Sequence, residues 1–155
     1  MKRLLITNPQ NTAALIARIA LGIVVFAHGA QKLLGWFGGY GFKGTMEFLT
    51  GGAGLPWIIA LLVILIESIG ALFVLTGFLT RLAAFGIFAE FIGVMLKVHL
   101  ANGFFMNWGG NQKGEGIEFF LLLFGLALVL IITGGGKASV DAALTRGGIV
   151  NKSDK

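Results

Sequence analysis

The chain has 155 residues, of which 56% are hydrophobic and 12% charged, and its mean hydropathy is +0.88. This length and composition indicate one membrane domain (residues 1–155) and exclude a soluble enzyme. It contains no cysteine, which excludes disulfides, thiolate metal ligands and mechanisms that use the protein's own thiols. The net charge of +5 comes mainly from the tails and one short turn, which favours contact with anionic lipid headgroups over nucleic-acid binding.

Four apolar segments are each close to the roughly 20 residues that cross a hydrocarbon core about 30 Å thick. None shows the alternation of polar and apolar positions that a membrane β-barrel requires. We therefore predict an all-α fold, an antiparallel bundle of four transmembrane helices. The expected helices cover residues 13–34, 56–79, 82–100 and 117–133, followed by a short surface helix at 139–146.

Residues at the segment ends support these boundaries. Asn11 or Thr12 can cap the first helix, and Pro56 opens the second, where its missing N–H costs nothing. The Thr80–Arg81 turn is so short that the second and third helices must be antiparallel neighbours. Glycines at 134–136 end the fourth helix.

Two connecting loops, residues 35–55 and 102–116, are rich in glycine and aromatic residues and poor in charge. Aromatic side chains in such loops suit the membrane–water interface. The simpler interpretation is an interfacial belt with flexible turns. The alternative is a lid over a site between the helices.

Lysine and arginine predict the orientation. Those expected on one side are Lys2, Arg3, Arg81, Lys137, Arg146, Lys152 and Lys155. Lys43 and Lys113 would face the other side, with Lys32 and Lys97 near its edge. The positive-inside rule then places both termini in the cytoplasm and both glycine-rich loops outside, in a multi-pass protein of the bacterial cytoplasmic (inner) membrane.

Residues 1–29 admit a second interpretation, a cleaved signal peptide with a basic N-terminal region. The cleavage site at residues 27–29 would be a poor one. Arg18 would also lie awkwardly before the apolar run, so a first transmembrane helix is the better interpretation.

Several ionisable residues lie inside the expected helices, where a charge at the bilayer centre costs at least ~2.5 kcal/mol. In the first helix Arg18, His28 and Lys32 fall within about an 80° arc and share a face. The later helices contribute Glu67, Glu90, Lys97, His99 and Glu118. The cost of lipid exposure predicts that Arg18, His28, Lys32, Glu67, Glu90 and Glu118 face the bundle interior.

The rise of about 1.5 Å per helical residue sorts these groups by depth. Arg18 lies in the inner third and Glu67 and Glu90 lie near the midplane, so one of these glutamates is expected to pair with Arg18. The outer third holds His28, Lys32, Lys97, His99 and Glu118. Glu118 is expected to pair with Lys32, His28 or Lys97. His99 follows Lys97 by two residues and points away from it if the helix continues.

An intramembrane polar network of Arg18, Glu67, Glu90 and Lys97 is expected, and two interpretations stand for the polar residues within the bundle. For Arg18 and Glu90 a purely structural role in holding the bundle together is favoured. His28 and Glu118 lie closest to the wet side and most resemble a ligand or proton site. No metal site is expected, because the two histidines lack HxxxH spacing. No catalytic residue can be assigned.

An ordered series of short motifs runs from Arg18 to Asp141. It comprises Arg18, H-G-x-x-K at 28–32, G-L-P at 54–56, Glu67, T-G-x-x-T-R at 76–81, His99 with N-G-F at 102–104, Glu118, and G-G-x-x-S-x-D at 135–141. This series resembles the DoxX/DoxD-like family of small bacterial membrane proteins. The resemblance implies a four-helix membrane bundle. Some family members are associated with oxidoreductase complexes, including a subunit of a thiosulfate:quinone oxidoreductase, which implies a partner subunit. Glu90 and Lys97 have no place in the family pattern.

Three functions remain open. The first is a quinone-interacting membrane subunit of an oxidoreductase, not catalytic alone and without a covalent cofactor, in which His28, Lys32, His99 and Glu118 line a pocket below the outer loops. The second is a non-enzymatic scaffold or assembly factor. The third is a small-solute or proton pathway. A pathway requires a continuous polar track from Arg18 to His28, whereas a quinone site requires polarity at one end only.

The topology is directly testable with reporter fusions. Fusions after Gly41 and after Gly110 are expected to report the outside, and a fusion after Lys152 the inside, because lysine and arginine are concentrated on the side of the termini. An odd number of crossings in paired phosphatase and fluorescent-protein fusions would contradict the four-helix prediction.

Overall fold

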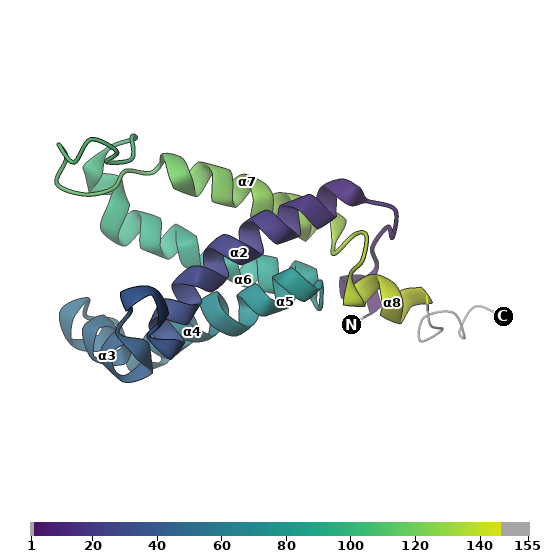
Figure 1. Ribbon diagram of the computed structural model, residues 1–155, viewed down its shortest axis with the longest axis horizontal. Coiled ribbons are helices and arrows are strands. Elements are labelled where there is room, and N and C mark those ends of the chain that lie inside the picture. The colour runs from purple at the N-terminus through teal and green to yellow at the C-terminus, as the bar shows by residue number, and fades with distance from the viewer. Residues whose placement is uncertain (1, 147–155) are drawn as a thin grey trace.

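A computed structural model describes residues 2–146, and within this range all regular elements are helices (Figure 1). The predicted all-α fold is therefore confirmed for this part of the chain. Lys152 and Lys155, used above to predict the orientation, lie outside the described residues.

Four helical rods correspond to the four apolar segments. The first is α2 (Thr12–Leu34) and the fourth is α7 (Glu118–Thr133). The second consists of α4 (Trp57–Leu65), η3 (Ile66–Gly70) and α5 (Ala71–Thr76); the third consists of α6 (Thr80–Val94), η4 (Met95–His99) and η5 (Leu100–Asn102). The first three rods are long and apolar enough to cross a membrane, whereas α7, with 16 residues, is shorter.

The helix ends follow the sequence signals. Asn11 caps α2, because its side-chain oxygen accepts a hydrogen bond from the Ala14 N–H at 3.0 Å. Gly134 ends α7 with a positive φ of 75°, a conformation that favours glycine. Ser139 caps the surface helix α8 (Val140–Arg146) by accepting the Ala142 N–H at 3.1 Å.

The central helix of the bundle is α2. It packs against α5, η3 and α7, and α6 packs against α7 and α5. In Figure 1, α2 crosses α6, with α7 on one side and the α4–α5 rod on the other. Apolar side chains from all four rods form the core, and its fully buried members include Val25, Val74, Ile87 and Leu130.

The segment 35–55 is more ordered than the flexible loop that the sequence predicts. It contains η1 (Trp36–Gly38), α3 (Gly41–Glu47) and the π-helical turn η2 (Phe48–Gly52). The prediction of flexible turns was wrong here, because the high glycine content of the segment masked the short helix α3 in the sequence. Aromatic side chains of this segment, such as Phe37 and Tyr40, are exposed, as an interfacial belt requires.

Arg18 holds together the end of the bundle where α1 (Lys2–Leu5) and α8 lie. Its guanidinium is buried and donates to the carbonyls of Leu75 at 2.7 Å, Lys137 at 3.0 Å and Ala138 at 3.1 Å, with a longer contact to Val74. The expected pairing of Arg18 with Glu67 or Glu90 is therefore wrong. Carbonyl groups at a helix end carry partial negative charge, and they satisfy the cation instead.

Asp141 fastens α8 to the start of α6. This fully buried carboxylate accepts hydrogen bonds from the N–H groups of Leu79 at 2.8 Å and Thr80 at 3.0 Å, and from the Thr80 hydroxyl at 2.7 Å. It thus acts as an N-cap for α6 from a distant part of the chain. Nearby, Arg81 donates to the carbonyls of Ile131 and Ile132, both at 2.6 Å, which ties α6 to α7.

Replacing Asp141 with alanine is expected to lower the free energy of unfolding by about 1.5–3 kcal/mol, because buried N–H and hydroxyl donors lose a charged acceptor. The measurement is thermal unfolding of the purified protein in detergent. Lys137→Ala is the matched control, since its exposed side chain lies in the same connection. Equal midpoints for the two variants would contradict the assigned role of Asp141.

Candidate functional site

An ion pair between Lys32 and Glu67 lies in the half of the bundle opposite to Arg18. The Lys32 Nζ and Glu67 Oε2 atoms are 2.5 Å apart, and the two side chains are 24% and 4% exposed. Lys32 comes from the last turn of α2 and Glu67 from the first turn of η3. Pairing offsets the large cost of placing either charge in an apolar surrounding.

Gly29 brings the two helices close enough for this pair to form. A Cβ atom at position 29 would overlap the backbone carbonyl of Glu67, so glycine is required for this approach. Lys32 follows Gly29 by three residues, nearly one helical turn, and therefore projects on the same side of α2 toward η3.

The ion pair separates two cavities. The smaller, of about 350 Å³, has aromatic walls from Phe91, Phe119 and Phe120, and Met106 covers part of it. Its polar groups come from His28, Lys32, Glu67, His99 and Glu115. The surroundings of the pair on this side are therefore rich in both ring faces and hydrogen-bonding groups.

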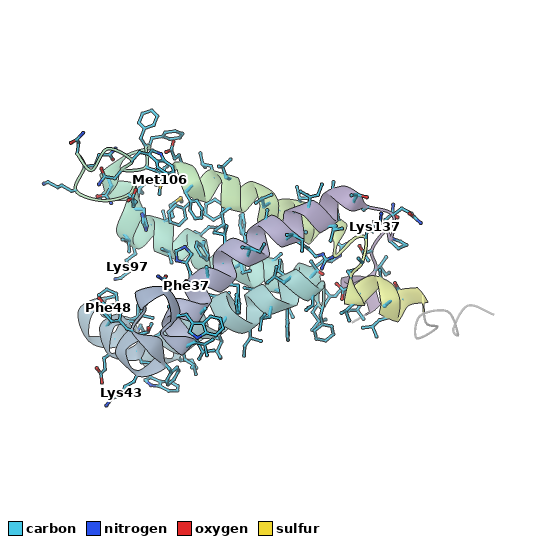
Figure 2. The ribbon with its side chains drawn as sticks, viewed as in Figure 1. Phe37, Lys43, Phe48, Lys97, Met106 and Lys137 are labelled. Carbon is cyan, nitrogen blue, oxygen red and sulfur yellow. The ribbon has the colours of Figure 1, made fainter. Side chains whose placement is uncertain are left out.

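The larger cavity, of about 540 Å³, lies between α4, η2 and the α6–η4 rod. Apolar side chains such as Leu49, Ile59 and Val63 form most of its wall. Its polar groups come from Lys32, Glu67, Glu90, Lys97 and His99. Phe48 and Lys97 lie on facing sides of this cavity, while Met106 lies above Lys97 in the view of Figure 2.

Three π-helical turns contribute residues to these cavities. Phe48 comes from η2, Glu67 from η3, and Lys97 and His99 from η4. A π turn accommodates one additional residue and rotates the positions that follow, and such turns are frequent at functional sites. Lys97 and His99 would point apart in a continuing α-helix, but a π turn replaces the α-helix here, and both residues line the larger cavity.

His99 is held in a defined orientation. Its Nδ1 atom lies 2.9 Å from the Glu115 carbonyl oxygen, and its ring packs on Phe120 with 4.7 Å between ring centroids. A carbonyl can only accept, so Nδ1 must carry the hydrogen. In the neutral ring, Nε2 is then a hydrogen-bond acceptor. His28, by contrast, is exposed where it lines the smaller cavity.

Glu118 has a different setting from the one expected. It accepts hydrogen bonds from the Met106 N–H at 2.8 Å and the Trp108 indole at 3.2 Å, and it is not among the residues that line either cavity. The expected pairing with Lys32, His28 or Lys97 is wrong, because backbone and indole donors of segment 103–117 are closer. Glu118 instead orders the segment that places Met106 over the smaller cavity.

Four ionisable residues outside the candidate pocket predicted from the sequence also line the cavities: Glu67, Glu90, Lys97 and Glu115. Glu67 is the one that forms the ion pair, although the sequence predicts for it only a place in the polar network. Its depth near the midplane separated it from the outer group. The signal that could have found it is the H-G-x-x-K motif, since a glycine one turn before a lysine indicates a close helix contact beside the cation.

The fold and the polar groups within it define a multi-pass helical membrane protein with a cluster of polar residues between its helices. The chain belongs to the DoxX family, whose model matches residues 13–100. CatD of Bacillus subtilis (strain 168), provisionally named as an oxidoreductase, is 31% identical over 133 residues, covering 86% of this chain and 87% of CatD.

Two proteins of Escherichia coli (strain K12), both named as inner membrane proteins, are similar to the same extent. YphA is 30% identical over 131 residues (82% of this chain, 86% of YphA), and YqjF is 30% identical over 142 residues (88% and 95%). No solved structure matches the chain. These relatives and the apolar helices confirm the predicted family and the predicted location in the bacterial cytoplasmic membrane.

A double-mutant cycle tests the ion pair. Lys32→Met and Glu67→Gln are each expected to lower thermal stability, because each leaves the other charge unpaired among apolar groups. The double variant is expected to be more stable than the two single effects predict, with a coupling of about 0.5–3 kcal/mol. Additive changes in the unfolding midpoint would show that the two charges do not depend on each other.

Proposed function

We propose that this protein is a four-span membrane subunit, with both termini in the cytoplasm, that binds a quinone-like molecule at Lys32 and Glu67 and acts with an oxidoreductase partner. The observation that carries the proposal is the position of the ion pair, between a cavity with aromatic walls and a larger apolar one. The redox group that reacts with the ligand would belong to the partner.

The polar groups suit a ligand with two carbonyl or hydroxyl oxygens. The Lys32 ammonium has three N–H donors and uses one on Glu67, so others remain for a ligand oxygen. His28 in the smaller cavity offers a ring nitrogen, and His99 offers Nε2 as an acceptor for a hydroxyl. These groups lie in the outer half of the proposed topology, where a proton can be exchanged with water.

The apolar groups suit the remainder of such a molecule. Ligand pockets commonly enclose about 300–1,000 Å³, and both cavities fall in this range. Phe119 and Phe120 give the smaller cavity an aromatic wall that suits a ring system, while the apolar wall of the larger cavity suits an isoprenoid chain. A molecule with a polar ring and an apolar tail matches one aromatic and polar cavity beside one apolar cavity better than a small hydrophilic solute does.

A transmembrane proton or solute pathway is less well supported. Such a pathway needs a continuous polar track from Arg18 to His28, and the intervening layer of the core is apolar. In α2 this layer contains Leu21 and Val25, and the facing rods add Ala71, Val74, Ala84 and Ile87. Polarity therefore reaches the ion pair from one end only, as a ligand site requires.

The partnership with an oxidoreductase is supported by the name of CatD, a relative that matches along most of its length. The rival function is a non-enzymatic scaffold that assembles partner proteins. The two differ in the ligand, because a scaffold has no need to bind a quinone between its helices.

Replacing His28 with glutamine is expected to leave thermal stability unchanged, because the side chain is exposed, and to weaken binding of a quinone analogue roughly tenfold through loss of the ring nitrogens. Binding is measured by titration of the purified protein in detergent. Lys43→Gln, an exposed position outside both cavities, is the control and should bind normally. A wild-type protein that binds no quinone analogue would favour the scaffold.

A further inference from the structure

Glu90 is a half-buried residue whose carboxyl group has no assigned use in the proposed ligand site. It belongs to α6, and both of its carboxyl oxygens are buried without a hydrogen-bond partner among residues 2–146. Glu90 is among the residues that line the larger cavity, together with Glu67 and Lys32. It is the one acidic side chain in the described part of the chain with both oxygens in this state.

The groups around Glu90 do not supply a counter-charge at hydrogen-bonding distance. From α2, Lys32 is held by Glu67 of η3, which itself carries the same sign as an ionised Glu90. From η4, Lys97 is exposed and His99 is bound to the Glu115 carbonyl. The remaining sides of the cavity, formed by η2 and α4, are apolar. His28 lies beyond the ion pair, on the smaller cavity.

An ionised carboxyl group in this setting would have lost its water without gaining a donor, which is among the most costly arrangements in a membrane. A bound proton removes that cost. The ion pair and a neutral Glu90 together carry no net charge, which suits the apolar wall around them.

We propose that Glu90 is a proton-binding site that exchanges its proton with the outer side of the membrane only, through the larger cavity. The exchange route runs past Glu67 and Lys32 to His99, all of which line that cavity. This inference goes beyond the quinone proposal, since it holds whatever molecule enters the cavity; the side of exchange rests on the topology proposed above.

Exchange toward the Arg18 end of the bundle, which is the cytoplasmic end in the proposed topology, would have to cross an apolar layer. Along α6, the next positions from Glu90 toward the Arg18 end of the bundle are Ile87, about one turn away, and Ala84, nearly two turns away. Both are fully buried. On α2, Val25 and Leu21 occupy the same layer. Arg18, the next polar group, donates to backbone carbonyls and is buried at 1% exposure.

The test uses dicyclohexylcarbodiimide, an apolar reagent that reacts with a protonated carboxylic acid in a membrane and not with a solvated carboxylate. The full chain is treated in proteoliposomes of known orientation, and labelled residues are mapped by mass spectrometry. Glu90 is expected to be labelled, and the label is expected to disappear in Glu90→Gln. Glu115 and Glu118, which accept N–H hydrogen bonds, serve as internal controls and should stay unlabelled.

Sidedness is tested by changing the pH of one compartment at a time. Raising the pH on the outer side is expected to reduce labelling, because the deprotonated form does not react, while raising it on the inner side has no effect. Infrared spectroscopy gives an independent measure, because the C=O band of a protonated acid should be lost in Glu90→Gln. The proposal is overturned by labelling of Glu67 in place of Glu90, by an unlabelled Glu90, by a response to inner pH, or by an unchanged acid band.

Discussion

The cost of a charge in an apolar surrounding shapes every polar feature of this protein. Arg18 is satisfied by backbone carbonyls at helix ends, and Lys32 and Glu67 satisfy each other. Glu118 is satisfied by donors of the loop segment that it orders. These side chains each have a hydrogen-bonding or ionic partner, whereas the carboxyl group of Glu90 has none among the described residues, which is why we assign it a bound proton.

The two ends of the bundle differ in how their polar side chains are used and in how closely their helices pack. At one end, Arg18, Arg81 and Asp141 bind backbone groups and fix the connections between α5, α6, α7 and α8. At the other end, the rods diverge around two cavities, and π turns interrupt the helices (Figure 1). The hydrogen bonds at the Arg18 end therefore fix the helix connections, while open space lies between the helices at the other end.

The sequence predicted the helices well because hydropathy and capping residues are local signals, as Asn11 and Gly134 show. It did not predict the partners of Arg18, because carbonyl acceptors are present at every residue and leave no mark in a sequence. The sequence also did not predict that Lys97 and His99 line the same cavity, because a π turn changes which residues share a face and has no signature in the composition. Of the four residues predicted to line a pocket, His28, Lys32 and His99 line the smaller cavity, whereas Glu118 does not.

The H-G-x-x-K motif shows how a family pattern can encode a helix contact and a polar site together. Gly29 allows α2 to touch the backbone of η3 at Glu67, and the lysine one turn later then meets the carboxylate of that same residue. The π turn at η3 also contributes to the pair, because it sets the direction in which Glu67 projects. A larger residue at position 29 would separate the helices and, with them, the two charges. The site therefore depends on backbone proximity as much as on the polar side chains, and a chain that kept the lysine and glutamate but lost the glycine would be expected to lose the pair.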